Sequence, residues 1–141
     1  MKKIILILIS LFLLTACDST EVFEKKCVQK VKSENTKYTQ NVKFVYTNTD
    51  ELLKVIVTNK YNSDNYNELE MIKESAKPYN NNLAKSPNIK IQIVADEENK
   101  YIVKYNFAVE KMSESELDKF NLNKNWIKLN NKIRESDLNC E

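Results

Sequence analysis

The chain has 141 residues, a formal charge of +2 and an apolar content of 42%, which is enough for one globular domain with a hydrophobic core. It contains neither histidine nor glycine. The lack of histidine excludes Ser-His-Asp and Cys-His catalytic arrangements and zinc sites of the usual histidine type. The lack of glycine excludes phosphate-binding loops, dinucleotide fingerprints and nucleophile elbows, because their backbone conformations are cheap only for glycine.

The N-terminus has the layout of a secretory signal. Two lysines at positions 2 and 3 precede an apolar run from Ile4 to Leu14 that only Ser10 interrupts. A helix that spans a bilayer needs about 20 apolar residues, so this run is too short for a permanent crossing. We therefore predict that residues 1–16 are a signal peptide that is removed on export.

The residues that follow, Leu14-Thr15-Ala16-Cys17, resemble a bacterial lipobox. The resemblance implies cleavage after Ala16 and a diacylglycerol attached to the sulfur of Cys17, whose thiolate is a good nucleophile. Residues 17–20 are then expected to form a short lipidated tether that holds the protein on the extracytoplasmic face of the cell membrane. The alternative is an ordinary cleaved signal with a chance cysteine nearby.

Loss of Lys2 and Lys3 with the signal brings the formal charge of the mature chain to about zero. The lysines and glutamates look interspersed, as on a solvated surface, whereas a nucleic-acid partner requires a basic stripe. We therefore expect no nucleic-acid partner. Residues 21–141 are expected to form one monomeric domain.

Cys27 and Cys140 remain after Cys17 is assigned to lipid, one near each end of the domain. Export permits a disulfide between them. The bridge closes a loop of more than a hundred residues, and the chain-entropy model gives it on the order of 4 kcal/mol of stability. We favour the disulfide over two free thiols, and we expect no metal site and no cofactor.

Three extended segments open the domain and predict an antiparallel meander. They run from Glu21 to about Lys32, around Val42–Tyr46 and from Leu52 to Tyr61, with a turn at Asn48-Thr49-Asp50 between the last two. The residues expected to share one side of each strand are Phe23, Cys27 and Val31, then Val42, Phe44 and Tyr46, then Leu53, Val55 and Val57.

A helix is predicted next, with Asp64 or Asn65 as its N-cap and an end at Ser86-Pro87. Apolar residues spaced three and four apart predict one buried stripe. We expect Pro78 to kink or divide this helix. The predicted stripe contains Leu69, Ile72, Ala76, Tyr79 and Leu83.

Two strands and two helices complete the predicted elements. Ile89, Ile91 and Ile93 alternate with polar residues in a half-buried strand, and the acidic turn Asp96–Asn99 leads into the clearest alternation of the chain. In that strand the inward residues are Tyr101, Val103, Tyr105, Phe107 and Val109.

Ser113-Glu114-Ser115-Glu116 then predicts a capping box for a short helix that ends at Phe120. A last helix from about Lys124 to Ser136 is predicted to bury Trp126, Leu129 and Ile133. The predicted order is β-β-β-α-β-β-α-α. It indicates an α+β fold with an antiparallel sheet of about five strands and its helices on one face.

This layout, with its lipobox, is similar to the YehR-like small bacterial lipoproteins. The correspondence centres on Asn99-Lys100-Tyr101-Ile102-Val103-Lys104-Tyr105 and extends from about Glu74 to Phe120. The meander Val42–Val57 matches less specifically, and the last helix is broadly alike. The family has no established activity, so the resemblance implies an architecture and a membrane address without catalytic residues.

Few side chains suggest a site. Tyr101 and Tyr105 are expected in the core, with ligand contact as the alternative. Asp96-Glu97-Glu98 can hold Ca²⁺ weakly, but it lacks the spacing of a calcium loop and is expected to be a solvated hairpin tip. The other residues considered are four tyrosines near element ends, Tyr38, Tyr46, Tyr61 and Tyr66, and three carboxylates for acid–base work, Glu110, Glu114 and Glu116.

The absence of any catalytic set predicts a protein that is not an enzyme. We expect a membrane-anchored, non-enzymatic binding or envelope-associated module with a protein partner in the envelope. The alternative is a small-ligand-binding lipoprotein with a pocket between helix and sheet. An enzyme that uses only carboxylates, tyrosine, lysine or serine requires two titratable groups that converge in one cleft.

Overall fold

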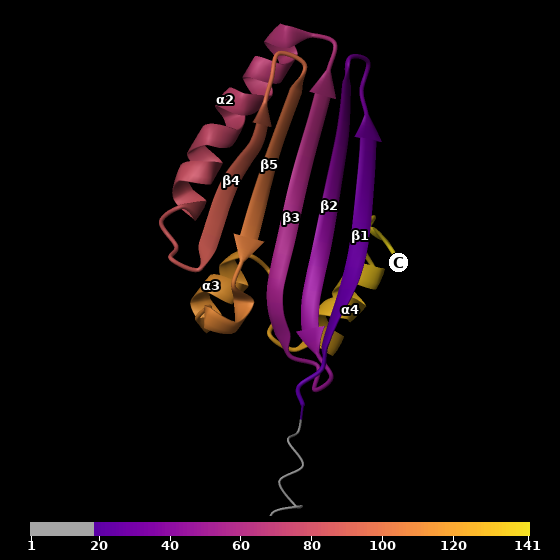
Figure 1. Cartoon of the computed structure of the whole chain (residues 1–141), viewed down its shortest axis with the longest axis vertical. Coiled ribbons are helices and arrows are strands. Elements are labelled where there is room, and N and C mark those ends of the chain that lie inside the picture. Colours follow the sequence, from indigo (N-terminus) through magenta and orange to yellow (C-terminus); the bar gives the residue numbers. More distant parts are fainter. Residues whose placement is uncertain (1–18) are drawn as a thin grey trace, which may run out of the picture.

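The computed structural model describes residues 19–141, which form a six-stranded antiparallel sheet with its helices on one face (Figure 1). The predicted α+β class is confirmed, and the sixth, two-residue strand is an addition. Cys17 and the predicted signal lie outside the described residues. Within residues 19–141, no helix has the length and apolar character needed to cross a membrane.

The strands lie in the order β4-β5-β3-β2-β1-β6 across the sheet. Helix α2 lies along the β4 edge, and α3 and α4 lie at the end of the sheet where β1 begins (Figure 1). The elements are β1 (Val22–Lys32), β2 (Thr36–Thr47), β3 (Leu52–Ser63), α2 (Tyr66–Leu83), β4 (Ile89–Asp96), β5 (Lys100–Phe107), the 3₁₀ turn η1 (Val109–Lys111), α3 (Glu114–Lys119), α4 (Trp126–Arg134) and β6 (Asn139–Cys140).

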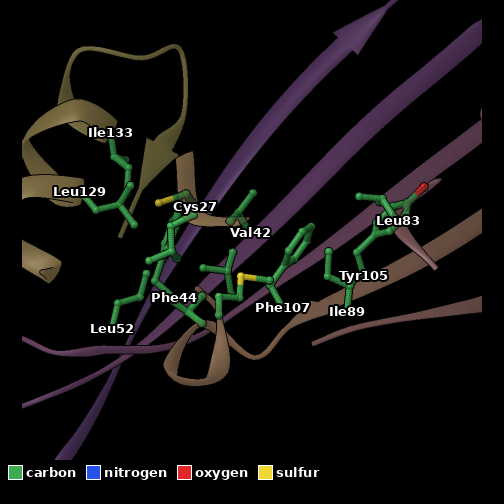
Figure 2. Packing of buried hydrophobic residues seen from close by; sticks show 14 of the residues in the cluster. Cys27, Val42, Phe44, Leu52, Leu83, Ile89, Tyr105, Phe107, Leu129 and Ile133 are labelled. Carbon is green, nitrogen blue, oxygen red and sulfur yellow. The ribbon is translucent and has the colours of Figure 1, made fainter. Parts of the chain in front are cut away.

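The core lies between the helices and the sheet face that they cover (Figure 2). The register between strands explains why the core residues share this face. Phe44, Val55 and Phe107 stand opposite one another on β2, β3 and β5 and point to the same side. Leu83 of α2 and Leu129 of α4 close over this face. The predicted inward alternation of β5 is confirmed for Tyr101, Val103, Tyr105 and Phe107, whereas Val109, predicted in the same strand, is buried in η1.

In the first strand, Phe23, Cys27 and Val31 share the helix side of the sheet, as predicted, but only Cys27 is buried. Phe23 and Val31 remain 42% and 53% exposed, although the ring of Phe23 lies 5.8 Å from that of Tyr46. Lys25 shares the face of Cys27 and donates to Asn130 Oδ1 on α4 at 3.1 Å. The helix side of β1 therefore combines the buried Cys27 with a polar contact to α4.

In β3, Leu52 is fully buried and Leu53 is only partly so, contrary to the prediction. The reason is a bulge, because Val45 pairs with Lys54 but the next residue, Tyr46, pairs with Leu52. One extra residue in a strand reverses which side chains face the core.

Helix α2 is not divided at Pro78, which lies exposed within a continuous helix. The predicted cap is confirmed, since the side chain of Asn65 accepts from the Glu68 N–H at 3.2 Å. The predicted stripe is narrower than expected, with Leu69 and Leu83 buried and Tyr79 55% exposed. Ile93, predicted on the apolar side of a half-buried strand, is 57% exposed on β4, which forms an edge of the sheet.

The C-terminal helices agree with the prediction. The capping box of α3 is present, with the Ser113 side chain accepting from the Glu116 N–H and the Glu116 side chain accepting from the Ser113 N–H. Trp126, Leu129 and Ile133 of α4 are buried. Beyond α4, β6 pairs with Cys27 and Val28 of β1, and a disulfide joins Cys27 to Cys140.

Candidate functional site

Three tyrosines form a row across the helix side of the sheet. Tyr38, Tyr61 and Tyr101 stand opposite one another on β2, β3 and β5. The rings of Tyr38 and Tyr61 stack with centroids 4.9 Å apart, and those of Tyr61 and Tyr101 lie 6.1 Å apart. Register alone produces this stack, because each ring occupies the same position along its own strand.

The row is covered at one end and open at the other. Tyr101 is 4% exposed beneath α2, as predicted for a core residue, whereas Tyr38 and Tyr61 are only partly buried. No helix crosses the upper halves of β1 and β2 (Figure 1). The rings of Tyr38 and Tyr61 are therefore available to a partner.

Amide side chains lie beside these two rings. Asn59 Oδ1 accepts from the Tyr38 hydroxyl and from Gln40 Nε2, both at 3.1 Å. Gln29 lies opposite Gln40 on β1, and Val31 lies opposite Tyr38. We call this group the tyrosine shelf, and its members are Gln29, Val31, Tyr38, Gln40, Asn59 and Tyr61.

The tyrosine shelf carries no charge. Burial raises the pKa of Tyr38 to about 12, and burial also raises the pKa of Tyr61, so both phenols are neutral near pH 7. The Nδ2 group of Asn59 makes no hydrogen bond to any residue in 19–141 and remains a free donor. The shelf thus offers two aromatic faces and amide groups to an uncharged surface.

The predicted acidic turn is used in a structural contact. Lys73 Nζ of α2 lies 2.6 Å from Asp96 Oδ1 and 2.7 Å from Glu70 Oε1, above the ring of Tyr101. Hydrogen bonds to Asp96 and then Glu70 raise the pKa of Lys73. This cluster joins α2 to the β4–β5 hairpin across a pocket of about 640 Å³, and Glu97 pairs separately with Lys100 at 3.0 Å.

The three candidate carboxylates do not form an acid–base pair. Glu116 accepts from Ser86 Oγ at 2.6 Å and from the Ser113 N–H at 3.0 Å, and these bonds lower its pKa. Glu110 and Glu114 are exposed. No group of three or more Cys, Asp and Glu side chains among residues 19–141 is placed to hold a metal ion.

The remaining tyrosines have different surroundings. Tyr46 stacks on Trp126 of α4 with centroids 4.4 Å apart, and Tyr66 is 53% exposed at the start of α2. Tyr105 is buried, as predicted, and its hydroxyl donates to Asn80 Oδ1 at 2.7 Å. Tyr105 is therefore not available to a ligand, and one face of the partly buried Tyr46 is covered by Trp126.

A separate apolar pocket of about 420 Å³ lies between α2, α3 and the sheet. Leu83 of α2, Phe120 and Leu122 form its helix side. The sheet side consists of Val55, Val57 and Phe107, so most of the lining is hydrocarbon.

No known protein family and no curated protein matches this chain. Among solved structures, the chain is similar to a protein from Streptococcus pneumoniae TIGR4 whose structure was determined by NMR. The two share 11% sequence identity and a TM-score of 0.52, over 91% of this chain and 90% of the other. At this identity the likeness shows a shared fold, which supports the α+β sheet described above.

Proposed function

We propose that this protein is a membrane-tethered, non-enzymatic module that binds an envelope protein through the tyrosine shelf. The observation that carries the proposal is the complete lack of charge on the shelf, in a chain of which 30% is charged. The cores of protein–protein interfaces are depleted in charged residues and enriched in aromatic ones. Tyrosine also contributes large contact area while it loses little rotamer entropy.

The anchor on Cys17 is the second part of the proposal. It is supported by the lipobox sequence and by the expected similarity to YehR-like lipoproteins. Cells fed a labelled lipid precursor should transfer the label to the wild-type protein and not to Cys17→Ala. Persistent labelling of Cys17→Ala protein would refute the assignment.

Site-specific photocrosslinking in intact cells tests the shelf. Gln40 faces the shelf, and its neighbour Asn41 faces the opposite side of the same strand, so they form a matched pair. A photoreactive residue at position 40 or 29 should give one discrete protein adduct of the same mass, and one at position 41 should not.

Shelf variants complete the test. Tyr61→Ala should abolish the adduct from position 40, because it removes half of the ring stack. Tyr66→Ala, at an exposed tyrosine outside the shelf, should leave it unchanged. An adduct that forms equally from positions 40 and 41, or that survives Tyr61→Ala, contradicts the proposal.

Capture of a small apolar ligand is the second candidate function, and the apolar pocket between α2, α3 and the sheet supports it. An apolar fluorescent probe should bind the purified protein and be excluded by Val57→Phe, which fills the sheet side of the pocket. Val45→Phe, on the opposite face of the sheet, is the control. Equal probe binding by both variants would dismiss this candidate.

A further inference from the structure

The sheet face without helices carries ten lysines from five strands. Register places them on this face, because their pairs alternate with the inward pairs such as Phe44–Val55. We call this surface the lysine face. Its lysines are Lys26, Lys30 and Lys32 of β1, Lys37 and Lys43 of β2, Lys54 and Lys60 of β3, Lys90 of β4, and Lys100 and Lys104 of β5.

Carboxylates are fewer than lysines on the same face, and two of them, Asp137 and Glu141, come from the C-terminal segment beside β1. Among the strand residues, Glu24 is the one carboxylate on it, since Asp96 faces α2. Lys43 pairs with Glu24 at 2.9 Å and Lys100 with Glu97 at 3.0 Å, and no ion pair within residues 19–141 neutralises the other eight. The expectation of interspersed charges is therefore wrong, because a chain of about zero net charge carries a strongly basic face.

The arrangement includes unfavourable contacts within the fold. Lys26 stands directly opposite Lys43, and Lys32 directly opposite Lys37. Like charges directly opposite across an antiparallel pair are destabilising. Glu24 offsets the first contact, because it pairs with Lys43 at 2.9 Å, but no ion pair within residues 19–141 offsets the second. A negatively charged surface that covers the face would do so.

The face is broad, with apolar residues between the charges. Five strands about 4.8 Å apart, two about 26 Å long and three about 36–40 Å long, make it a surface wider than a single polymer chain. A hollow of about 980 Å³ on it is lined by lysines, by apolar residues such as Val28 and Ile56, and by two carboxylate residues, Asp137 and Glu141. Long lysine stems lying over apolar residues place their ammonium groups outward, where phosphate groups can reach them.

We propose that the lysine face lies on the anionic lipid headgroups of the membrane that holds the protein. The inference rests on the proposed anchor at Cys17, from which the chain to Val22 reaches at most about 18 Å when fully extended. Such a short tether keeps the face close to the bilayer, within or near the range of its surface potential. The tyrosine shelf, on the opposite side of the sheet, then points away from the membrane toward its partner.

Amine reactivity in vesicles tests this orientation. The full protein is purified from membranes, its attached lipid is verified by mass, and it is placed in vesicles of phosphatidylcholine with or without phosphatidylglycerol. Acetylation by a water-soluble reagent is then followed lysine by lysine. With phosphatidylglycerol, the lysine face should react about fivefold more slowly, and Lys119 and Lys128 on the helices should not change. The protection should disappear at about 1 M salt, where the screening length is about 3 Å.

Two variants of equal net charge locate the effect. Replacement of Lys30, Lys60, Lys90 and Lys104 by glutamine should abolish the protection of the remaining face lysines. The same change at four helix-side positions, Lys77, Lys85, Lys119 and Lys128, should preserve it. Thermal melts of both variants check that each is folded.

The outcomes separate this inference from the proposed function. Equal acetylation rates in both vesicles, with lipid attached, overturn the orientation and leave the anchor intact. If no lipid is attached, the anchor proposal fails, and flotation of the protein with phosphatidylglycerol vesicles alone still supports the lysine face. Protection by soluble polyphosphate but not by anionic vesicles overturns the membrane assignment in favour of a soluble polyanion.

Discussion

Leu52 and Leu53 are neighbours of identical chemistry whose surroundings differ because of one bulge. Leu52 is fully buried at the end of the core, and its N–H donates to the Lys124 carbonyl at 2.6 Å. Leu53 is only partly buried. Alternation in the sequence predicts that Leu53 is the buried one of the two leucines, since it lies two and four residues before Val55 and Val57. The bulge that buries Leu52 instead has no residue signature in this strand.

The pair provides a direct stability test. We expect Leu52→Ala to lower the free energy of unfolding by about 2–5 kcal/mol, because it leaves a cavity in the core. Leu53→Ala should cost clearly less. Urea denaturation of the two variants measures the difference, and a larger cost for Leu53→Ala would contradict the register described here.

Tyr38 makes the free energy of unfolding depend on pH in the alkaline range. Burial raises its pKa from 10.0 to about 12, so between these values the unfolded chain loses the phenolic proton while the folded chain retains it. Its contribution is fully present below pH 10 and is lost as the pH rises toward 12. The free energy of unfolding of wild type should therefore fall more steeply over this range than that of Tyr38→Phe, as measured by urea denaturation at each pH. If the free energies of wild type and Tyr38→Phe fell in parallel with pH, folding would not raise the pKa of Tyr38.

At the level of elements, the helix caps and the strand alternation are local patterns, and they are predictable from the sequence. The N-cap at Asn65 and the capping box at Ser113 each depend on residues within one turn. The tyrosine shelf is different, because it requires Gln40 and Asn59 to meet across two strands. Neither residue is unusual in its own segment, so only the register between β2 and β3 reveals the shelf.

Pro78 shows how tertiary contacts override a local rule. Proline provides no N–H, so the carbonyl of Glu74 lacks its usual donor, yet Leu69 and Leu83 hold both ends of α2 against the sheet. Pro78→Ala should restore the bond and raise the free energy of unfolding by about 1–3 kcal/mol in urea denaturation. Pro87→Ala, in the turn after the helix, should not raise the free energy of unfolding. An equal rise from both variants would mean that the effect comes from the unfolded chain and not from the restored hydrogen bond.

At the level of the whole molecule, the number of charges is predictable and their placement is not. Composition shows that acidic and basic residues nearly balance, but the segregation of ten lysines on one face depends on the pairing of five strands. Glu70 and Glu74 of α2 lie with Asp96 around a pocket on the other side. Net charge alone therefore conceals a large separation of charge across the thickness of the sheet.

The disulfide ties the C-terminal segment to the first strand across 113 residues of chain. Reduction, or the double variant Cys27→Ser with Cys140→Ser, should lower the free energy of unfolding by about 4 kcal/mol in urea denaturation, because a large loop is released in the unfolded state. Reduction should not affect the double variant further. Alkylation of both thiols in protein isolated without a reductant would contradict the bridge.

The pairing of β1 with β2 also determines how the domain carries force. The two strands are paired without interruption from Val22 and Thr47 to Lys32 and Lys37. Consider a force that pulls the N-terminal end of β1 while the other strands are held. It acts parallel to β1 and β2, so all the hydrogen bonds between these two strands bear the force together instead of one after another. A tether placed before β1 therefore strains the sheet in shear, the direction in which it yields least readily.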